Sequence, residues 1–132
     1  MIDKMPAGTL VVVADGEVAR VFRNVGDGRT PVLQQFEMLE LMNMNDDGPA
    51  AVMPGESTGK QIDQATFAKQ LALRLNDGAL NDKYTHLVLV ADPQTLGLMR
   101  PLLHEETRLR MVGELAKTLT NSPLADIERA LS

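Results

Sequence analysis

Asp15 and Asp92 stand at the ends of two similar apolar runs and are the first candidates for a functional site. Asp15 follows residues 9–14 and Asp92 follows residues 87–91, and both runs close with the pair Ala-Asp. Apolar runs of this kind are typical of strands buried on both faces, as in the middle of parallel sheets. Open α/β sheets bind ligands at the carboxyl edge of their strands, where two carboxylates could hold Mg²⁺. A metal-dependent hydrolase that uses these two residues is therefore one hypothesis.

The local sequence favours a structural explanation for both aspartates. Asp15 precedes Gly16, as expected in a hairpin turn, and Asp92 precedes Pro93, as expected of a residue that caps a helix. No third acidic residue in a clear motif completes a metal site. The sequence also lacks the nucleophile-elbow, phosphate-loop and dinucleotide-binding motifs. We therefore expect no cofactor, no metal and no catalytic residue, and an enzyme is the less favoured class.

A basic group is the second candidate, and it consists of Arg100, His104, Arg108 and Arg110. These side chains could together contact a phosphate, or they could form an ordinary solvated helix end. The solvated helix end is the favoured explanation. The stretch that begins at His104 is not the His-Glu-x-x-His zinc motif, because the second histidine is missing. The four residues are kept as candidate binding residues.

Composition narrows the class of protein. The 132 residues are 44% hydrophobic, which predicts a single globular domain over 1–132. The formal net charge of −5 opposes general nucleic-acid binding, which Lys and Arg drive by neutralising phosphates. Cysteine is absent, which excludes disulfides and a cysteine nucleophile. No apolar stretch reaches the length of a signal peptide or a membrane helix, so we expect a cytoplasmic protein without a membrane partner.

The expected elements alternate as they do in α/β domains. Strands are predicted at 9–14, 17–24, 32–42 and 87–91, and helices at 60–80, from Pro93 to about 103 and from Pro123 to 131. Pro101 should kink or split the second helix, and a short helical turn should follow at 104–107. Residues 109–117 fit both a strand and a helix. The order of the elements implies a mixed sheet with helices on its faces.

Residues 43–59 have neither a helical nor a strand period. Loops of this length are usually either functional or mobile, and a mobile loop without chemistry of its own is the favoured explanation. Met44 and Met53 could nevertheless form an adaptable contact surface. The helix that follows should begin with a capping box made by Thr58 and Gln61.

Several short segments occur in a characteristic order along nearly the whole chain. They are Pro6-Ala7-Gly8-Thr9, Val13-Ala14-Asp15-Gly16-Glu17-Val18-Ala19-Arg20, Phe67-Ala68-Lys69-Gln70-Leu71-Ala72, Leu87-Val88-Leu89-Val90-Ala91-Asp92-Pro93, Leu96-Gly97 with Leu103-His104, and Val112-Gly113-Glu114-Leu115 with Leu119-Thr120. In this order and spacing they resemble the bacterial host attachment protein family, described as required for attachment to host cells. That family is similar to the middle domain of archaeal and eukaryotic peptide-chain release factors. The resemblance implies a ribonuclease-H-like α/β fold in which 110–117 is a strand. The sheet would then be mixed, mainly parallel and five-stranded, with helices on both faces.

The resemblance also has a consequence for activity. Release-factor domains carry Gly-Gly-Gln just before the long helix, and the matching place here is Gly59-Lys60-Gln61. Because this sequence has no Gly-Gly-Gln, we do not expect peptidyl-tRNA hydrolysis. Gln61 is either a remnant of that motif or simply the capping-box residue.

Two hypotheses stand beside the hydrolase. The first is a non-enzymatic domain of the host attachment type that binds a protein partner through 43–59 and the edge near Asp15 and Asp92. The second is a translation-associated module that contacts the ribosome or a transfer RNA through the arginines of the basic group. The negative net charge ranks the second below the first. The sequence implies neither a particular protein partner nor an oligomeric state.

Overall fold

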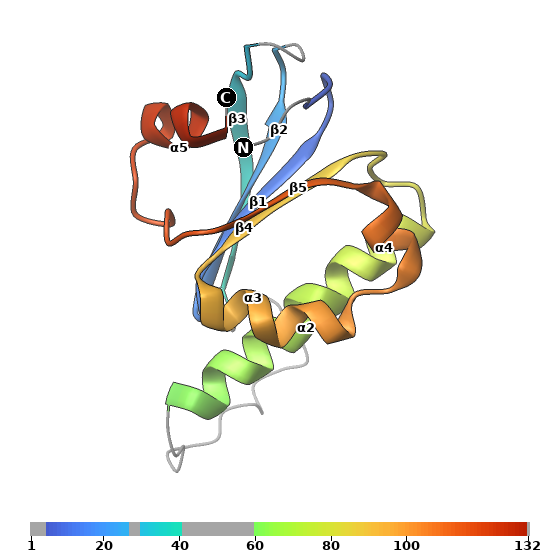
Figure 1. The fold of residues 1–132 in the computed structure, drawn as a ribbon, viewed down its shortest axis with the longest axis vertical. Coiled ribbons are helices and arrows are strands. Elements are labelled where there is room, and N and C mark those ends of the chain that lie inside the picture. Colours follow the sequence, from blue (N-terminus) through green and yellow to red (C-terminus); the bar gives the residue numbers. More distant parts are fainter. Residues whose placement is uncertain (1–4, 27–29, 41–59, 132) are drawn as a thin grey trace.

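The chain forms one mixed sheet with helices against both of its faces (Figure 1). The computed structural model describes residues 5–26, 30–40 and 60–131, and for 36–40 and 60–63 it describes the backbone alone. The strands are β1 (Leu10–Ala14), β2 (Val18–Asn24), β3 (Leu33–Glu40), β4 (Leu87–Ala91) and β5 (Met111–Ala116). In space they follow the order β3-β2-β1-β4-β5.

Four of the five strands point in the same direction. β1 pairs in parallel with β4, and β4 pairs in parallel with β5. β2 pairs antiparallel with both β1 and β3, so β2 alone runs the other way. The prediction of a mixed, mainly parallel five-stranded sheet is therefore confirmed.

The two apolar runs are neighbours at the centre of the sheet. Every residue of β1 and β4 is buried, and the register pairs Val12 with Leu89 and Ala14 with Ala91. Alternate side chains of a strand point to opposite faces of its sheet. Strands that are apolar at every position are stable only where both faces are covered, which explains why helices are needed on each side.

The helices divide unequally between the two faces (Figure 1). One face carries α2 (Lys60–Leu80), α3 (Pro93–Met99), the 3-10 helix η2 (Arg100–Leu102) and α4 (Glu105–Arg110), and the other carries α5 (Leu124–Leu131). On the α2 face, Val12 and Leu89 share a core with Phe67 and Leu71. On the α5 face, the neighbouring strand positions share a second core with Ile127 and Leu131. The prediction of helices on both faces is confirmed.

Residues 109–117, whose pattern fits both a strand and a helix, change from helix to strand after Arg110. α4 ends at Arg110 and β5 begins at Met111, so the strand that the resemblance implied is confirmed and a helix over 109–117 is wrong. Pro101 lies in η2 between α3 and α4, which confirms that it splits the second helix. The helical turn expected at 104–107 is the somewhat longer α4.

β3 is an edge strand, and its pairing with β2 is irregular between Val21 and Phe22, as its uneven apolar pattern suggested. Residues 41–42 of the predicted strand and the whole of 43–59 lie outside the described residues. No helix within the described part of the chain is both long and apolar enough to cross a membrane.

Tyr84 fixes the connection from α2 to β4. Its ring is 4% exposed, and its hydroxyl donates to the carbonyl oxygen of Leu75 at 2.6 Å. The ring lies against Gly78, where an added Cβ would stand 2.9 Å from Tyr84 Cε2. Burial raises the pKa of the Tyr84 hydroxyl above its ordinary value, while Thr107 and the Arg110 charge partly oppose that rise. Ionising Tyr84 in the folded chain is therefore unfavourable.

Leu89→Ala should lower the free energy of unfolding by about 3 kcal/mol, because it removes a fully buried side chain from the central strand pair. Leu73→Ala is the matched control, since Leu73 is 53% exposed on α2 and should change stability by less than about 0.5 kcal/mol. Urea unfolding followed by circular dichroism measures both variants. Equal losses would contradict the placement of Leu89 in the core.

Tyr84 should make the free energy of unfolding fall as the pH rises above about 10. Its raised pKa means that the folded chain keeps this proton at a pH where the unfolded chain has lost it, so alkali favours unfolding. Tyr84→Phe removes this contribution together with the hydrogen bond to Leu75. The stability gap between wild type and Tyr84→Phe should therefore narrow between pH 8 and pH 11 in urea titrations, by at most about 1.4 kcal/mol per pH unit. A gap that stays constant over this range would refute the prediction.

Candidate functional site

The carboxyl edge of the sheet brings Asp15 and Asp92 to neighbouring positions. Ala14 and Ala91 are directly paired in the parallel β1–β4 register, and each aspartate is the next residue of its chain segment. The expected placement of both residues at one edge is therefore correct. Whether they can act together depends on what each carboxylate already contacts.

Both oxygens of the Asp15 carboxylate accept hydrogen bonds from the protein. Oδ1 accepts the backbone N–H groups of Glu17 at 2.7 Å and Val18 at 2.9 Å, which closes the turn from β1 to β2. Oδ2 accepts the hydroxyl of Thr120 at 2.8 Å. Asp15 thus connects the turn to the segment between β5 and α5.

Asp92 caps α3, as its position before Pro93 indicated. Its Oδ2 accepts the backbone N–H of Thr95 at 3.1 Å. Its Oδ1 is buried and has no hydrogen-bond partner among the described residues. The Thr95 hydroxyl accepts a hydrogen bond from Nε2 of Gln64 at 3.2 Å, which connects α3 to α2.

The carboxyl edge is closely packed where α2 approaches it. A Cβ added at Gly16 would stand 2.6 Å from Cγ of Gln64, so the turn after Asp15 directly contacts α2. Among the residues that the structure describes, no group of three or more His, Cys, Asp or Glu side chains could hold a metal ion. The two carboxylates have separate structural contacts, and the hydrolase hypothesis stays a prediction.

The arginines of the basic group are largely paired with acids. Nη2 and Nε of Arg100 donate to Glu114 at 2.8 and 3.3 Å, and Nη2 of Arg110 donates to Asp82 at 2.9 Å. These hydrogen bonds raise the pKa of both guanidinium groups. Arg108 is exposed and donates to the carbonyl oxygen of Arg100 at 2.6 Å. Two of the three cations are therefore neutralised by neighbouring carboxylates.

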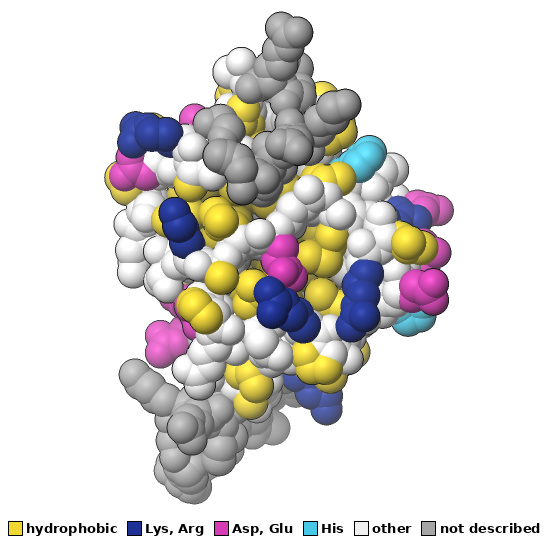
Figure 2. Space-filling model, viewed as in Figure 1, with side chains coloured by type: hydrophobic (Ala, Val, Ile, Leu, Met, Phe, Trp, Pro, Cys, Tyr) yellow, Lys and Arg dark blue, Asp and Glu magenta, His cyan; other side chains and the backbone are white. Residues whose placement is uncertain are grey.

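The basic group is also divided in space. Arg110 reaches back to the carbonyl oxygen of Tyr84, at the edge of the sheet where β4 and β5 begin. His104 caps α4, with Nδ1 accepting the backbone N–H of Glu106 at 3.1 Å. Figure 2 shows Lys and Arg side chains in separate places on the face in view, with Asp and Glu beside several of them. The Lys and Arg side chains in view therefore do not form one continuous basic patch.

Gln61 lies in the first turn of α2, but its side chain is outside the described residues. The capping box and the remnant of Gly-Gly-Gln are therefore both predictions still. The contact surface expected at 43–59, with Met44 and Met53, also lies outside the described residues.

Arg20 has a connecting role that the sequence analysis did not identify. Its Nη1 donates to the carbonyl oxygens of Thr120 at 3.1 Å and Ser122 at 2.9 Å, and its Nε donates to Gln35 at 2.9 Å. Together with Asp15 it fixes the segment that leads from β5 to α5. A cation within a strand of alternating pattern is a weak signal of such a role, because its partners are distant in sequence.

Removing either candidate carboxylate should lower the free energy of unfolding, and the loss should be larger for Asp15, which accepts more hydrogen bonds than Asp92. Asp92→Ala loses one helix cap and should lower the free energy of unfolding by about 1 kcal/mol. Asp15→Ala loses three hydrogen bonds and should cost about 2 kcal/mol. Glu17→Ala is the control, because Glu17 is exposed in the same turn. Urea titrations in which Asp15→Ala is as stable as Glu17→Ala would contradict the structural role.

The chain matches the sequence model of a known protein family. The sequence model of bacterial archaeo-eukaryotic release factor family 12 matches residues 8–131. A search of the curated proteins found no match. The match covers almost all of the described residues and confirms the relationship to release factors that the sequence indicated. The chain belongs to bacterial archaeo-eukaryotic release factor family 12.

Proposed function

We propose that this chain is a release-factor-like binding module that contacts the ribosome or a transfer RNA without hydrolysing peptidyl-tRNA. The observation that carries the proposal is the family match over residues 8–131. The absence of Gly-Gly-Gln from the full sequence supports the second half of it. The module would then act by occupying a site and not by cleaving a bond.

The contacts of the candidate residues support a non-catalytic role. A general acid or base must have a free atom within hydrogen-bond reach of the reacting group. Both oxygens of Asp15 accept protein donors, one oxygen of Asp92 caps α3 while the other is buried, and Nδ1 of His104 caps α4. These side chains therefore stabilise turns and caps, and we expect no chemistry from them.

Binding to RNA would depend on few cations. Arg108 is exposed and contacts a carbonyl oxygen, whereas Arg100 and Arg110 are paired with carboxylates. Each neutralised phosphate releases counterions, so the dependence of binding on salt reports the number of such contacts. We expect a shallow but measurable salt dependence in which Arg108 takes part.

A protein partner of the host attachment type is the second candidate. The pairing of Arg100 and Arg110 with acids favours it, because neutralised arginines attract phosphates weakly. The net charge of −5 points the same way. On this alternative the contact surface would be the carboxyl edge near Asp15 and Asp92. A metal-dependent hydrolase ranks third, and calorimetry with Mg²⁺ would test it through the loss of binding heat in Asp15→Asn.

Sedimentation of the protein from its own cell lysate distinguishes the two leading candidates. At native expression level, the ribosome proposal expects co-migration with ribosomes at low salt and a measurable decrease of it at high salt. With purified ribosomes, Arg108→Gln should weaken binding and lower the salt slope by roughly one unit. Arg129→Gln is the matched control, since Arg129 is an exposed arginine of α5 on the opposite face of the sheet.

Free migration under both salt conditions would refute the ribosome proposal and leave the protein partner ahead. Co-migration that is unaffected by salt would also count against contacts to RNA phosphates. Equal binding by Arg108→Gln and Arg129→Gln would exclude Arg108 from the contact surface.

A further inference from the structure

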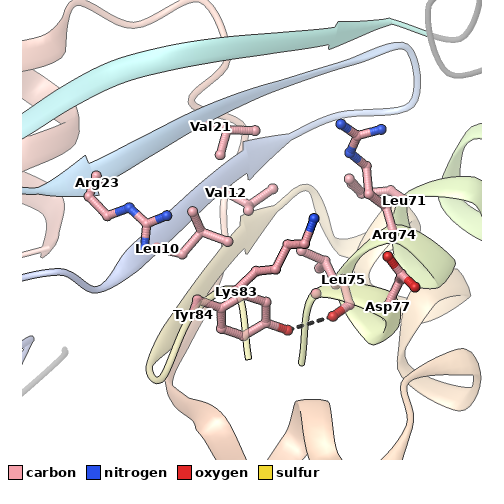
Figure 3. A pocket seen from close by; sticks show the side chains of 11 residues that line it. Leu10, Val12, Val21, Arg23, Leu71, Arg74, Leu75, Asp77, Lys83 and Tyr84 are labelled. Carbon is pink, nitrogen blue, oxygen red and sulfur yellow. Dashed lines mark hydrogen bonds between the residues drawn. The ribbon is translucent and has the colours of Figure 1, made fainter. Parts of the chain in front are cut away.

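A cavity of about 370 Å³ lies between the sheet and the C-terminal half of α2 (Figure 3). Leu10, Val12 and Val21 line it from β1 and β2, and Leu71 and Leu75 line it from α2. Its volume falls in the range of small-molecule sites. It extends to the first residue of β1 and does not include Asp15 or Asp92, so it is distinct from the carboxyl edge.

The charged side chains around this cavity are mostly positive. Arg23 comes from β2, Arg74 from α2 and Lys83 from the connection to β4, and Asp77 is the single carboxylate. Figure 3 shows the three cations reaching the cavity from these three places, around its apolar residues. This excess of positive charge stands out because the whole chain carries a net charge of −5. The cavity should therefore attract anions.

The contacts of the charged residues indicate which cation can receive a ligand. Arg23 donates to the carbonyl oxygen of Gly8 at 3.1 Å, and Asp77 accepts the side-chain amide of Asn81 at 3.0 Å. The backbone N–H of Lys83 donates to the carbonyl oxygen of Gly78 at 2.8 Å, whereas its side-chain ammonium makes no hydrogen bond or ion pair with any residue that the structure describes. An ammonium group at the mouth of an apolar cavity can bind the head of an anionic ligand while the cavity holds its apolar part.

We propose that this cavity binds a single-headed anionic amphiphile, with an unbranched aliphatic chain inside and a carboxylate or phosphate monoester head on Lys83. A methylene group is about the size of a water molecule, so a volume of about 370 Å³ sets an upper limit of roughly a dozen such groups, and a chain of about ten carbons is a suitable probe. The proposal is independent of ribosome binding, because it uses neither Arg108 nor the carboxyl edge.

The lining favours an aliphatic chain over a nucleotide base. Bases are usually bound by stacking on aromatic faces. Tyr84 is the one aromatic residue of the lining, and its hydroxyl donates to the carbonyl oxygen of Leu75, which fixes its ring in place. The remaining apolar residues of the lining are leucines and valines, which pack well against a flexible hydrocarbon chain.

Tyr84 provides a direct readout of binding. The chain contains one tyrosine and no tryptophan, so its tyrosine fluorescence arises from Tyr84 alone. Decanoate and decyl phosphate, titrated into the full chain below their micelle concentrations, should each give a saturable change that weakens with added salt. The relative affinities of the two probes identify the preferred head group. Decyltrimethylammonium, which has the same chain and the opposite charge, should bind at least about tenfold more weakly, and inorganic phosphate alone should give no change.

Lys83→Met should raise the Kd for decanoate about tenfold, because it removes the charged hydrogen bond and keeps the apolar stem. Lys69→Met is the matched control, since Lys69 is an exposed lysine of α2 outside the lining and its replacement should leave the Kd unchanged. Leu10→Phe should fill the cavity and abolish binding. If Leu10→Phe does not fold by circular dichroism, the two lysine variants still decide the matter.

Four results would overturn the proposal. One is the absence of a saturable Tyr84 response to either anionic probe. Another is equal affinity for the cationic probe, which would mean that the cavity does not select by charge. The third is a wild-type Kd in Lys83→Met, which would remove the head group from its assigned position. A full response to inorganic phosphate alone would equally contradict the need for an aliphatic chain.

Discussion

Both faces of β1 and β4 must be kept from water, and most of the architecture follows from this requirement. Each strand is buried at every position, and its side chains alternate between two separate cores. A parallel pair needs a long crossover, and α2 provides it while covering one face. The other face would stay exposed without Ile127 and Leu131 of α5. The chain therefore needs helices on both sides of the sheet even though only one face carries the long crossover.

The same strand pairing explains why the two aspartates meet and why they have structural contacts. Strands that end in register leave their next residues at one edge, where the chain must turn or begin a helix. Asp15 closes the turn and Asp92 caps α3, which are the tasks that aspartate performs well at such places. Asp15 goes beyond its turn by accepting the Thr120 hydroxyl, which helps to hold the segment that leads to α5. Proximity of two carboxylates at this edge is thus a consequence of the fold.

The cations that are close together in the sequence are not the ones that gather around the cavity in the folded chain. Arg100 and Arg110 are close in sequence, but Glu114 and Asp82 pair with them in the fold. Arg23 and Lys83 are distant in sequence and line one apolar cavity. Arginines that are clustered in the sequence are therefore largely neutralised, whereas the cations around the cavity come from distant parts of the chain. Ion pairs and cavities both depend on tertiary contacts, so spacing along the chain is a poor guide to them.

Local patterns were enough to predict the buried strands, the long helix, the split at Pro101 and the cap at Asp92, because each depends on a few neighbouring residues. The resemblance to known sequences was needed to make 111–116 a strand, since its apolar positions fit two periods. The contacts of Asp15 with Thr120, and of Arg20 with Thr120 and Ser122, came only from the folded chain. The cavity under α2 also became known only from the folded chain, because its shape depends on how closely a helix and a sheet approach each other. The burial of side chains, and their pairing with residues far away in the sequence, leave no pattern in a single sequence. In the folded chain they determine which charges remain available for binding.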